Sequence, residues 1–200
     1  MNDIGYAGLV IIVISAFGLF GNVNVVIATI RKKNLRSNNG ILLCLLAVYD
    51  IVCLLFEISN GTRMICGNAI NQSNCFKTII VYFCVQYVSA STLVGLALDR
   101  LAAVAFPFWY MTHHVGYTLT ISTIPGILLS GIFVVLGGIN LESDNSTLRV
   151  CFLGNVMPNG LQKYSNACLF GLNVCVIVIY LTAYAVLHIQ TKVPMIHKYM

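Results

Sequence analysis

Apolar residues fall into five long runs that are separated by shorter polar stretches. The runs cover approximately residues 6–30, 41–59, 78–106, 118–139 and 166–189. A helix needs about 20 apolar residues to cross a hydrocarbon layer of about 30 Å, and each run has roughly this length or more. We therefore predict an all-α membrane protein, in which residues 1–200 form one transmembrane domain, a bundle of five transmembrane helices.

The composition supports the same class of protein. Only 17 of the 200 residues are charged, 11 basic and 6 acidic, whereas an ordinary soluble chain of this length has about 50. Apolar residues make up 58% of the chain, more than the core of a soluble protein of this size could bury. These values exclude a soluble globule, a disordered chain and a nucleic-acid-binding protein, and they make the lipid bilayer a partner.

Basic residues predict the orientation of the helices, because Lys and Arg near the ends of a span favour the cytoplasmic side. If the five runs alternate across the bilayer, seven basic residues lie on one side and four on the other. The larger group comprises Arg31, Lys32, Lys33, Arg36, Arg100, Lys192 and Lys198. We therefore place these residues inside and the amino terminus outside. Residues 1–3 carry no positive charge, so the first run is interpreted as a retained span and not as a signal peptide.

Three Asn-x-Ser/Thr sequences, the pattern required for N-glycosylation, agree with this orientation. They begin at Asn60, Asn71 and Asn145, and all three fall in segments assigned to the outside. Asn60 is too close to the expected membrane boundary to be a good acceptor. Asn71 and Asn145 are therefore the predicted glycosylation sites.

Ionisable residues inside the spans are the main candidates for function, since a buried charge costs about 2.5 to 3.5 kcal/mol on insertion. Asp50 lies near the middle of the second run, and Asn22 lies at a similar depth in the first. A hydrogen bond donated by the amide of Asn22 would reduce the free-energy cost of burying the Asp50 carboxylate. Such a pair either forms a functional site or only holds two packed helices together. Glu57 is closer to the outer boundary, where it either contacts a ligand or extends to water.

The third run ends in Asp99-Arg100-Leu101, and Pro107 follows. We expect a local ion pair between Asp99 and Arg100 that holds the guanidinium until a partner competes for it, although a simple interfacial anchor is the alternative. Pro107 lacks an amide hydrogen and restricts the residue before it. The third helix is therefore predicted to end there.

Cysteines on the outer side predict a disulfide bond. Cys75 precedes Arg100 by 25 residues, a helical rise of about 37 Å that carries it to the outer surface. Cys151 lies in the second long outer loop, and a bond between the two would tie this loop over the third helix. Cys66 is the competing outer cysteine.

Together these residues resemble a rhodopsin-like G-protein-coupled receptor, and among such receptors the nematode serpentine chemoreceptors of class SX. The resemblance rests on a set of motifs along the whole chain: Gly21-Asn22, Leu35-Arg36-Ser37, Leu46-Ala47-x-x-Asp50, Cys75, and Asp99-Arg100-Leu101 followed by Pro107. It implies a receptor of the plasma membrane that binds an extracellular small molecule or peptide and signals through a heterotrimeric G protein.

The resemblance also implies roles for individual residues. Arg100, with its neighbours, would belong to the G-protein-facing switch, and Asn22 and Asp50 to a polar centre. Ser89 stands where the family places a second ligand of a sodium ion held by the aspartate, so a sodium ion at Asp50 is a candidate cofactor and no other is expected. Tyr82 stands where amine receptors carry an aspartate, which argues against an ammonium pocket of that type. Tyr82 and Glu57 remain candidate ligand-pocket residues.

The end of the chain departs from the family pattern. Only ten residues follow the fifth span, and they include Pro194, so they cannot form sixth and seventh spans. We expect a truncated product or an incomplete gene model, with a natural five-helix isoform as the alternative, and we expect that this chain alone does not signal. Pairing with a full-length receptor is a further alternative.

Two other functions are alternatives to a receptor. No metalloprotease, nucleophile-elbow, phosphate-loop or paired CxxC motif occurs, and His113-His114 is the only dense group of metal-binding side chains, without nearby carboxylates. We therefore predict that the protein is not an enzyme and holds no catalytic metal. A five-span transport or channel subunit, with Asp50 and Glu57 along a cation path, is the stronger rival, but it leaves Asp99-Arg100 unexplained.

Overall fold

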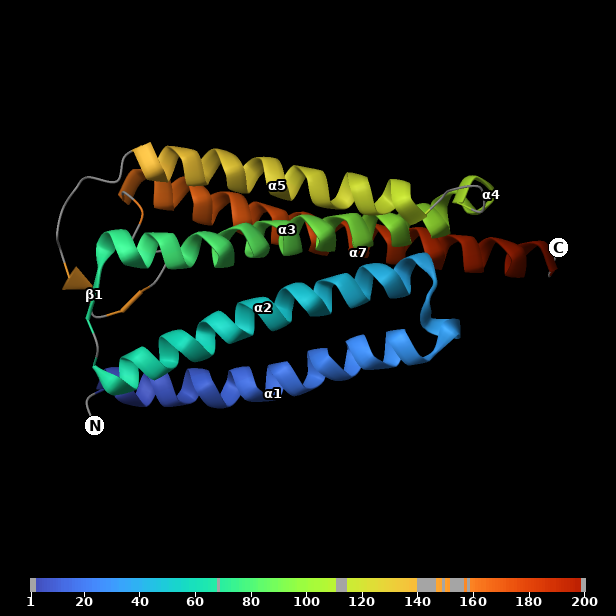
Figure 1. The fold of residues 1–200 in the computed structure, drawn as a ribbon. Helices are drawn as coiled ribbons and strands as arrows, with labels where there is room; N and C mark the ends of the chain where they lie inside the picture. Colours follow the sequence, from blue (N-terminus) through green and yellow to red (C-terminus); the bar gives the residue numbers. More distant parts are fainter. Residues whose placement is uncertain are drawn as a thin grey trace.

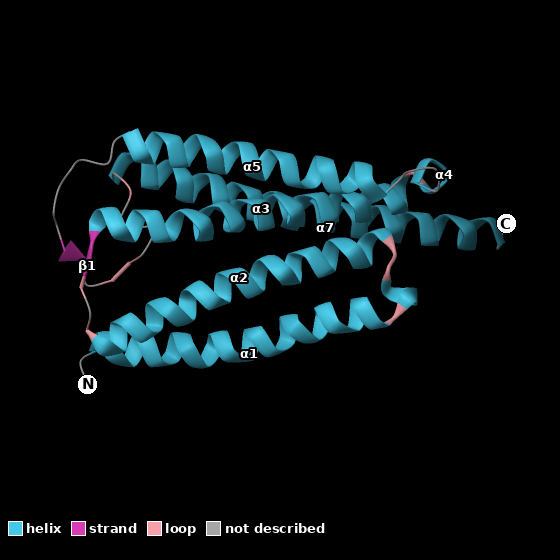
Figure 2. Cartoon of the chain, in the orientation of Figure 1, coloured by secondary structure: helices cyan, strands magenta, loops and turns pink. Residues whose placement is uncertain are grey.

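A computed structural model describes residues 3–67, 69–110, 115–139, 147–148, 150–151, 157 and 159–198. Five long helices dominate these residues (Figure 1), and Figure 2 shows how little other secondary structure accompanies them. The long helices are α1 (Asp3–Arg31), α2 (Asn38–Cys66), α3 (Gln72–Ala105), α5 (Val115–Ile139) and α7 (Asn159–Lys198). The short elements are η1 (Lys33–Leu35), β1 (Ile70–Asn71), α4 (Pro107–Tyr110) and β2 (Thr147–Leu148).

Each long helix is apolar and long enough to cross a bilayer, which confirms the predicted class, an all-α bundle of five membrane-spanning helices. The candidate spans within them are Asp3–Arg31, Asn39–Cys66, Gln72–Ala105, Thr118–Ile139 and Gly160–Gln190. Several helices are longer than the apolar runs because polar residues at the membrane surfaces extend them. The largest extension is at α7, which continues to Lys198.

Helix ends follow local sequence signals. Ser37 caps α2, its hydroxyl accepting a hydrogen bond from the amide of Gly40 at 3.3 Å. Gly67 ends the same helix with a φ of 68°, a left-handed conformation that glycine adopts without strain. As predicted, α3 ends before Pro107, which instead begins α4.

The helices α1 and α2 pack closely where two glycines face each other. A Cβ atom at Gly8 would lie 2.7 Å from the carbonyl oxygen of Gly61, and one at Gly61 would lie 2.8 Å from that of Gly8. Side chains at either position would therefore force the helices apart. Small residues at such crossings are typical of membrane helix pairs.

Helix α3 lies at the centre of the bundle and contacts α2, α5 and α7. Its inward side chains, including Phe83, Tyr87 and Thr92, are completely buried. The helices around it expose large apolar side chains instead, such as Phe17 on α1 and Phe170 on α7, at 75% and 71%. This distribution fits a bundle whose outer surface faces lipid.

The two short strands close one end of the bundle. Strands β1 and β2 pair antiparallel, with Ile70 opposite Leu148 and Asn71 opposite Thr147. The amino terminus lies at this end in Figure 1, whereas η1 and its basic residues join α1 to α2 at the other. The start of α1 and the basic residues of η1 therefore lie at opposite ends of the bundle, and the assignment of the amino terminus to the outside stays a prediction from the positions of the basic residues.

Candidate functional site

The outer end of α3 is tied to the second outer loop by a disulfide bond. The Sγ atoms of Cys75 and Cys151 are 2.02 Å apart and their Cα atoms 5.6 Å apart. Both cysteines are buried with Phe76 and Ile79 in one apolar cluster. The competing cysteine, Cys66, is exposed and free. The predicted Cys75–Cys151 bond is therefore present.

The two candidate ligand-pocket residues are neighbours between α2 and α3. The Tyr82 hydroxyl lies within interaction range of Glu57, with Cys53 close by. The ring of Phe56 meets that of Tyr82 edge-on, with centroids 6.1 Å apart. Glu57 and Tyr82 are both half-buried. The structure thus brings a carboxylate against Tyr82 from a different helix.

The carboxylates of α2 share one face of this helix. Asp50, Cys53 and Glu57 follow one another at intervals of three and four residues, so their side chains lie one above another. The thiol of Cys53 lies within electrostatic range of both carboxylates. A line of acidic groups therefore runs from the centre of the membrane towards its outer surface.

The expected hydrogen bond between Asn22 and Asp50 is absent. The Asn22 amide donates instead to the carbonyl oxygen of Gly18, one turn back in its own helix, at 3.0 Å. An amide side chain can always reach this carbonyl, so it needs no partner from α2. Asp50 is exposed and forms no hydrogen bond or ion pair with another described residue, and Ser89 is buried, also without a hydrogen bond there.

At the inner end, Asp99 pairs with Tyr110, which no motif in the sequence identifies as its partner. The hydroxyl of Tyr110 donates to Oδ2 of Asp99 at 3.0 Å, and Asp99 is 6% exposed. The expected ion pair between Asp99 and Arg100 is absent among the described contacts, because adjacent residues on a helix point about 100° apart. The hydrogen bond joins α4 to the end of α3.

The same contact affects the phenol of Tyr110. Burial, and after it the charge of Asp99 together with the hydrogen bond to it, raise the pKa of Tyr110 above its usual value, while Arg100 opposes this shift. Arg100 itself is exposed and Leu101 is half-buried. The guanidinium is therefore accessible at the inner surface, and the neutral phenol holds the Asp99 carboxylate.

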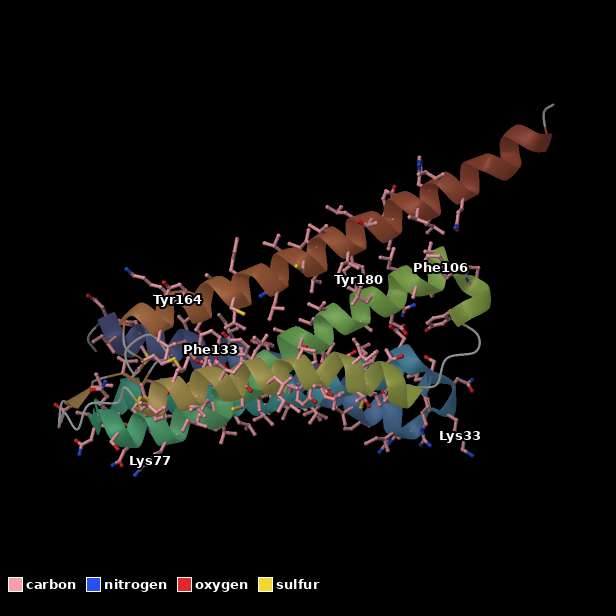
Figure 3. All side chains as sticks on the ribbon, turned by 90° about the horizontal axis from the view of Figure 1, so that it is seen from above. Lys33, Lys77, Phe106, Phe133, Tyr164 and Tyr180 are labelled. Carbon is pink, nitrogen blue, oxygen red and sulfur yellow. A yellow bond between two sulfur atoms is a disulfide. The ribbon has the colours of Figure 1, made fainter. Side chains whose placement is uncertain are left out.

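Buried polar contacts connect α3 to α5 and α7. The Tyr87 hydroxyl lies 2.9 Å from Oγ of Ser165 and donates to the Ser165 carbonyl at 3.1 Å. The hydroxyl of Ser91 donates to the carbonyl of Ser122 at 2.7 Å. These pairs were missed in the sequence, where the only available signal was a group of polar residues within an apolar run. Helix α7 contacts α3 again near its inner end, where Nε2 of Gln190 donates to the carbonyl of Val104 at 3.2 Å. In Figure 3 the carboxyl end of α7 extends beyond the bundle.

The predicted glycosylation site Asn71 lies on β1, where its side chain is exposed. Asn145 lies outside the described residues, but Thr147, the third residue of its sequence pattern, pairs with Asn71 across the two strands. His113 and His114 also lie outside the described residues. In the part of the chain that the structure describes, no group of three or more His, Cys, Asp or Glu side chains could hold a metal ion.

Comparisons with known proteins identify the family of this chain. Residues 15–197 match the sequence model of the family described as "Serpentine type 7TM GPCR chemoreceptor Srsx". The match covers most of the chain, and the chain belongs to this family. It is therefore a multi-pass membrane protein of the G-protein-coupled receptor superfamily, and membership of a receptor family implies the plasma membrane and a non-enzymatic role.

Individual relatives are more distant. The chain is 27% identical to olfactory receptor 13G1 from Homo sapiens over 120 residues, 58% of this chain and 39% of the receptor. It is 26% identical to dopamine receptor 3 from Caenorhabditis elegans over 170 residues, 78% of this chain and 27% of the receptor. It is 29% identical to D(2) dopamine receptor A from Xenopus laevis over 144 residues, 68% of this chain and 31% of the receptor. The matched part thus spans between about a quarter and two fifths of each relative.

Proposed function

We propose that the chain belongs to a chemosensory receptor that binds an extracellular ligand between the outer halves of α2 and α3 and acts on a heterotrimeric G protein at the inner end of α3. The observation that supports this proposal is the position of Tyr82 and Arg100 on one continuous helix. They are 18 residues apart, a rise of about 27 Å. A ligand contact at one end and an accessible guanidinium at the other are thus linked by a single rigid element.

The ligand site in this proposal consists of Glu57, Tyr82 and Phe56. A carboxylate, a phenol and an aromatic ring together suit a small polar ligand, and a positively charged group would find both an opposite charge and a ring face there. The relatives include an olfactory receptor and two dopamine receptors. Their names agree with a small-molecule ligand, and the acidic contact would come from Glu57 in α2.

The inner site in this proposal consists of Arg100, Asp99 and Tyr110. The Tyr110 hydroxyl satisfies the Asp99 carboxylate, so Asp99 does not compete with a partner for Arg100. Leu101 and Pro107 shape the end of α3 at this surface. A ligand that favours one arrangement of the helices would change how Arg100 is presented to the G protein.

Sodium is part of the proposal as an ion held by Asp50 and Ser89. The donors fit its chemistry, since Na⁺ binds carboxylate and hydroxyl oxygens, and neither side chain forms another hydrogen bond among the described residues. Asn22 is already bound to Gly18 and is not required. Bound sodium would supply a positive charge that stabilises the Asp50 carboxylate within the membrane.

The test begins with long sequencing reads across the whole transcript, which define the translated product. This product is expressed with a G-protein sensor and exposed to a panel of volatile amines, other odorants and short peptides. Arg100→Ala is expected to abolish the sensor response while ligand binding remains, and Glu57→Gln to weaken binding. Arg63→Ala, a matched change at the outer end of α2, should have neither effect.

The same cells distinguish the receptor from the cation-path alternative. Glu57→Gln and Asp50→Asn should leave membrane conductance unchanged in the absence of ligand. A ligand-independent change in cation current in these variants, with an intact response in Arg100→Ala, would contradict the proposed receptor and support a channel subunit. The family match does not favour that alternative.

A further inference from the structure

A groove runs along the inner ends of α1, α2 and α5, on the opposite side of the membrane from the proposed ligand site. It encloses about 370 Å³. Its walls are mostly apolar, with Ile30 from α1, Ile41, Leu45 and Val48 from α2, and Leu119 from α5. Val48 lies 12 residues beyond Arg36, so the groove reaches from the membrane surface into the hydrocarbon layer.

One charged side chain, Arg36, lines the groove. Its guanidinium lies over the carboxyl end of α1, where Nε donates to the carbonyl of Thr29 at 3.5 Å and a terminal nitrogen donates to that of Ile30. A guanidinium has five N–H donors, so these two bonds leave others for a further acceptor. Arg36 is thus held at the groove by the helix that it caps.

The surroundings of Arg36 are strongly positive. Arg31, Lys32 and Lys33 lie in the same connection and are exposed. No acidic residue occurs between Asp3 and Asp50, and the structure shows no ion pair to these four basic residues among the described side chains. One positive charge therefore lines the apolar groove, and three more lie within five residues of it in the sequence, without a nearby acidic residue.

An occupant of this groove must have an apolar part long enough to follow its walls and a negative head at the membrane surface. Soluble anions lack the first part and sterols lack the second, while zwitterionic lipids such as phosphatidylcholine carry a phosphate whose charge is balanced by an ammonium group. Basic residues next to membrane helices attract anionic lipids of the cytoplasmic leaflet, each contributing to the affinity. Arginine also binds phosphate through two parallel hydrogen bonds.

We propose that this groove binds an anionic phospholipid of the inner leaflet, with one acyl chain along Leu45 and Val48 and its phosphate at Arg36. Lys32 and Lys33 contribute charge around the head group. The site does not depend on the proposed ligand or on a G protein, and it can therefore be tested by lipid binding alone.

The test is native mass spectrometry of the purified protein in detergent, titrated with dioleoyl phosphatidylserine or dioleoyl phosphatidylcholine. Phosphatidylserine is expected to bind at least fivefold more tightly. Arg36→Gln should weaken its binding about fivefold, the effect of one basic residue near the surface. Arg63→Gln at the outer end of α2 is the matched control and should leave the affinity unchanged.

Two further measurements distinguish lipid binding in the groove from general electrostatic attraction to the basic surface. Val48→Trp fills the groove and should weaken phosphatidylserine binding, whereas Val135→Trp, at an exposed position on α5, should not. Glycerophosphoserine, the head group without acyl chains, should not compete with the lipid. Because Arg36→Gln also removes contacts to α1, Lys32→Gln provides a second charge variant that leaves these contacts intact.

Several results would overturn the proposal. Equal binding of the two lipids would remove the selectivity for an anionic head group. An unchanged affinity in Val48→Trp, or effective competition by glycerophosphoserine, would show attraction to the basic loop without use of the groove. Equal losses in Arg36→Gln and Arg63→Gln would show that it does not matter at which end of the bundle the positive charge lies.

Discussion

Tyr87 on α3 and Ser165 on α7 are both completely buried and are joined through the Tyr87 hydroxyl, 2.9 Å from Oγ of Ser165. The ring of Tyr87 also packs against Phe83 and Phe133, with centroids 4.8 and 5.5 Å away. A polar contact within an aromatic cluster is directional, so it fixes which residues of α7 face α3. It holds the outer half of α7 against α3, while near the inner end of α7 the side chain of Gln190 donates a second hydrogen bond to the carbonyl of Val104 on α3, at 3.2 Å.

Tyr87→Phe is expected to destabilise the protein by about 1 to 3 kcal/mol, because the Ser165 hydroxyl loses its buried partner. Ser165→Ala should lower the free energy of unfolding by about the same amount. The double variant should lower it by less than the sum of the two single losses. Thermal unfolding in detergent micelles measures the effect. Tyr180→Phe, at an exposed position on α7, is the control. Fully additive losses would contradict a direct interaction between the two side chains.

Gly126→Ala is expected to destabilise the packing of α5 on α3. The added Cβ would lie 2.7 Å from Cα of Val88 and 2.8 Å from the carbonyl oxygen of Tyr87, both backbone atoms that cannot rotate away. Overpacking of this kind costs about 1 to 3 kcal/mol.

Gly131→Ala, five residues further along α5, is the matched control for this prediction. Nothing lies within 4 Å of a Cβ atom at Gly131, so its melting temperature should be unchanged or slightly higher. If the two alanine variants had the same melting temperature, this would contradict the close approach of α3 and α5 at Gly126.

Cys75→Ser and Cys151→Ser should each lower stability by about 2 to 5 kcal/mol, and the two single variants should behave alike. Cys66→Ser, which changes an exposed free thiol, should have little effect. Mass spectrometry of unreduced peptides identifies the bond directly. A peptide in which Cys66 is linked to Cys151 would contradict the observed pairing.

Asp99→Asn is expected to lower the pKa of Tyr110 but not to return it to its usual value, since burial is the larger cause of the shift and remains in the variant. A phenol whose pKa is raised by folding stabilises the protein below its unfolded pKa of about 10. This contribution is lost as the pH rises from there through the folded pKa.

The Tyr110 titration can be followed by NMR of protein labelled with ¹³C at the tyrosine ring, with Tyr110→Phe identifying the signal. The loss of stability at alkaline pH should be smaller in Asp99→Asn than in the parent. An unchanged Tyr110 titration in that variant would exclude the contact between the two residues.

Asn71→Gln is expected to remove one N-linked glycan, because Asn71 is exposed at the outer end of the bundle. The change in electrophoretic mobility, compared with that caused by peptide N-glycosidase F, measures this. Ser73→Ala should have the same effect, since the hydroxyl residue is part of the acceptor pattern. Gln72→Ala keeps the pattern and is the control. A mobility that only Asn145→Gln changes would assign the glycan to the other site.

Sequence reasoning predicted the helices and the outer disulfide bond because both depend on features that are local or few in number. Apolar runs of membrane-spanning length are sufficient to identify helices in lipid. The two cysteines were identified by their expected positions on the outer side of the membrane. The pairing of Ile70 with Leu148 in the two short strands brings Cys151 close to Cys75.

Side-chain partners were harder to predict, for a physical reason. Asp99 was paired with its neighbour Arg100, but the direction of a side chain around a helix decides its partner, and Asp99 points towards Tyr110. Asn22 was paired with Asp50 by depth alone, although its own helix offered a nearer acceptor. The contact between Tyr87 and Ser165 joins residues 78 positions apart, and no sequence pattern specifies the packing that brings them together.

The disulfide bond has a consequence for how the protein is made. Cys151 follows Cys75 by 76 residues, so Cys75 waits in the oxidising lumen of the secretory pathway as an unpaired thiol while α5 is synthesised and inserted. During that time the nearby outer thiol of Cys66 is already present and can be oxidised with it. The correct bond therefore depends on the late pairing of β2 with β1, which brings Cys151 to the end of α3, and errors in oxidative folding should concentrate at Cys66.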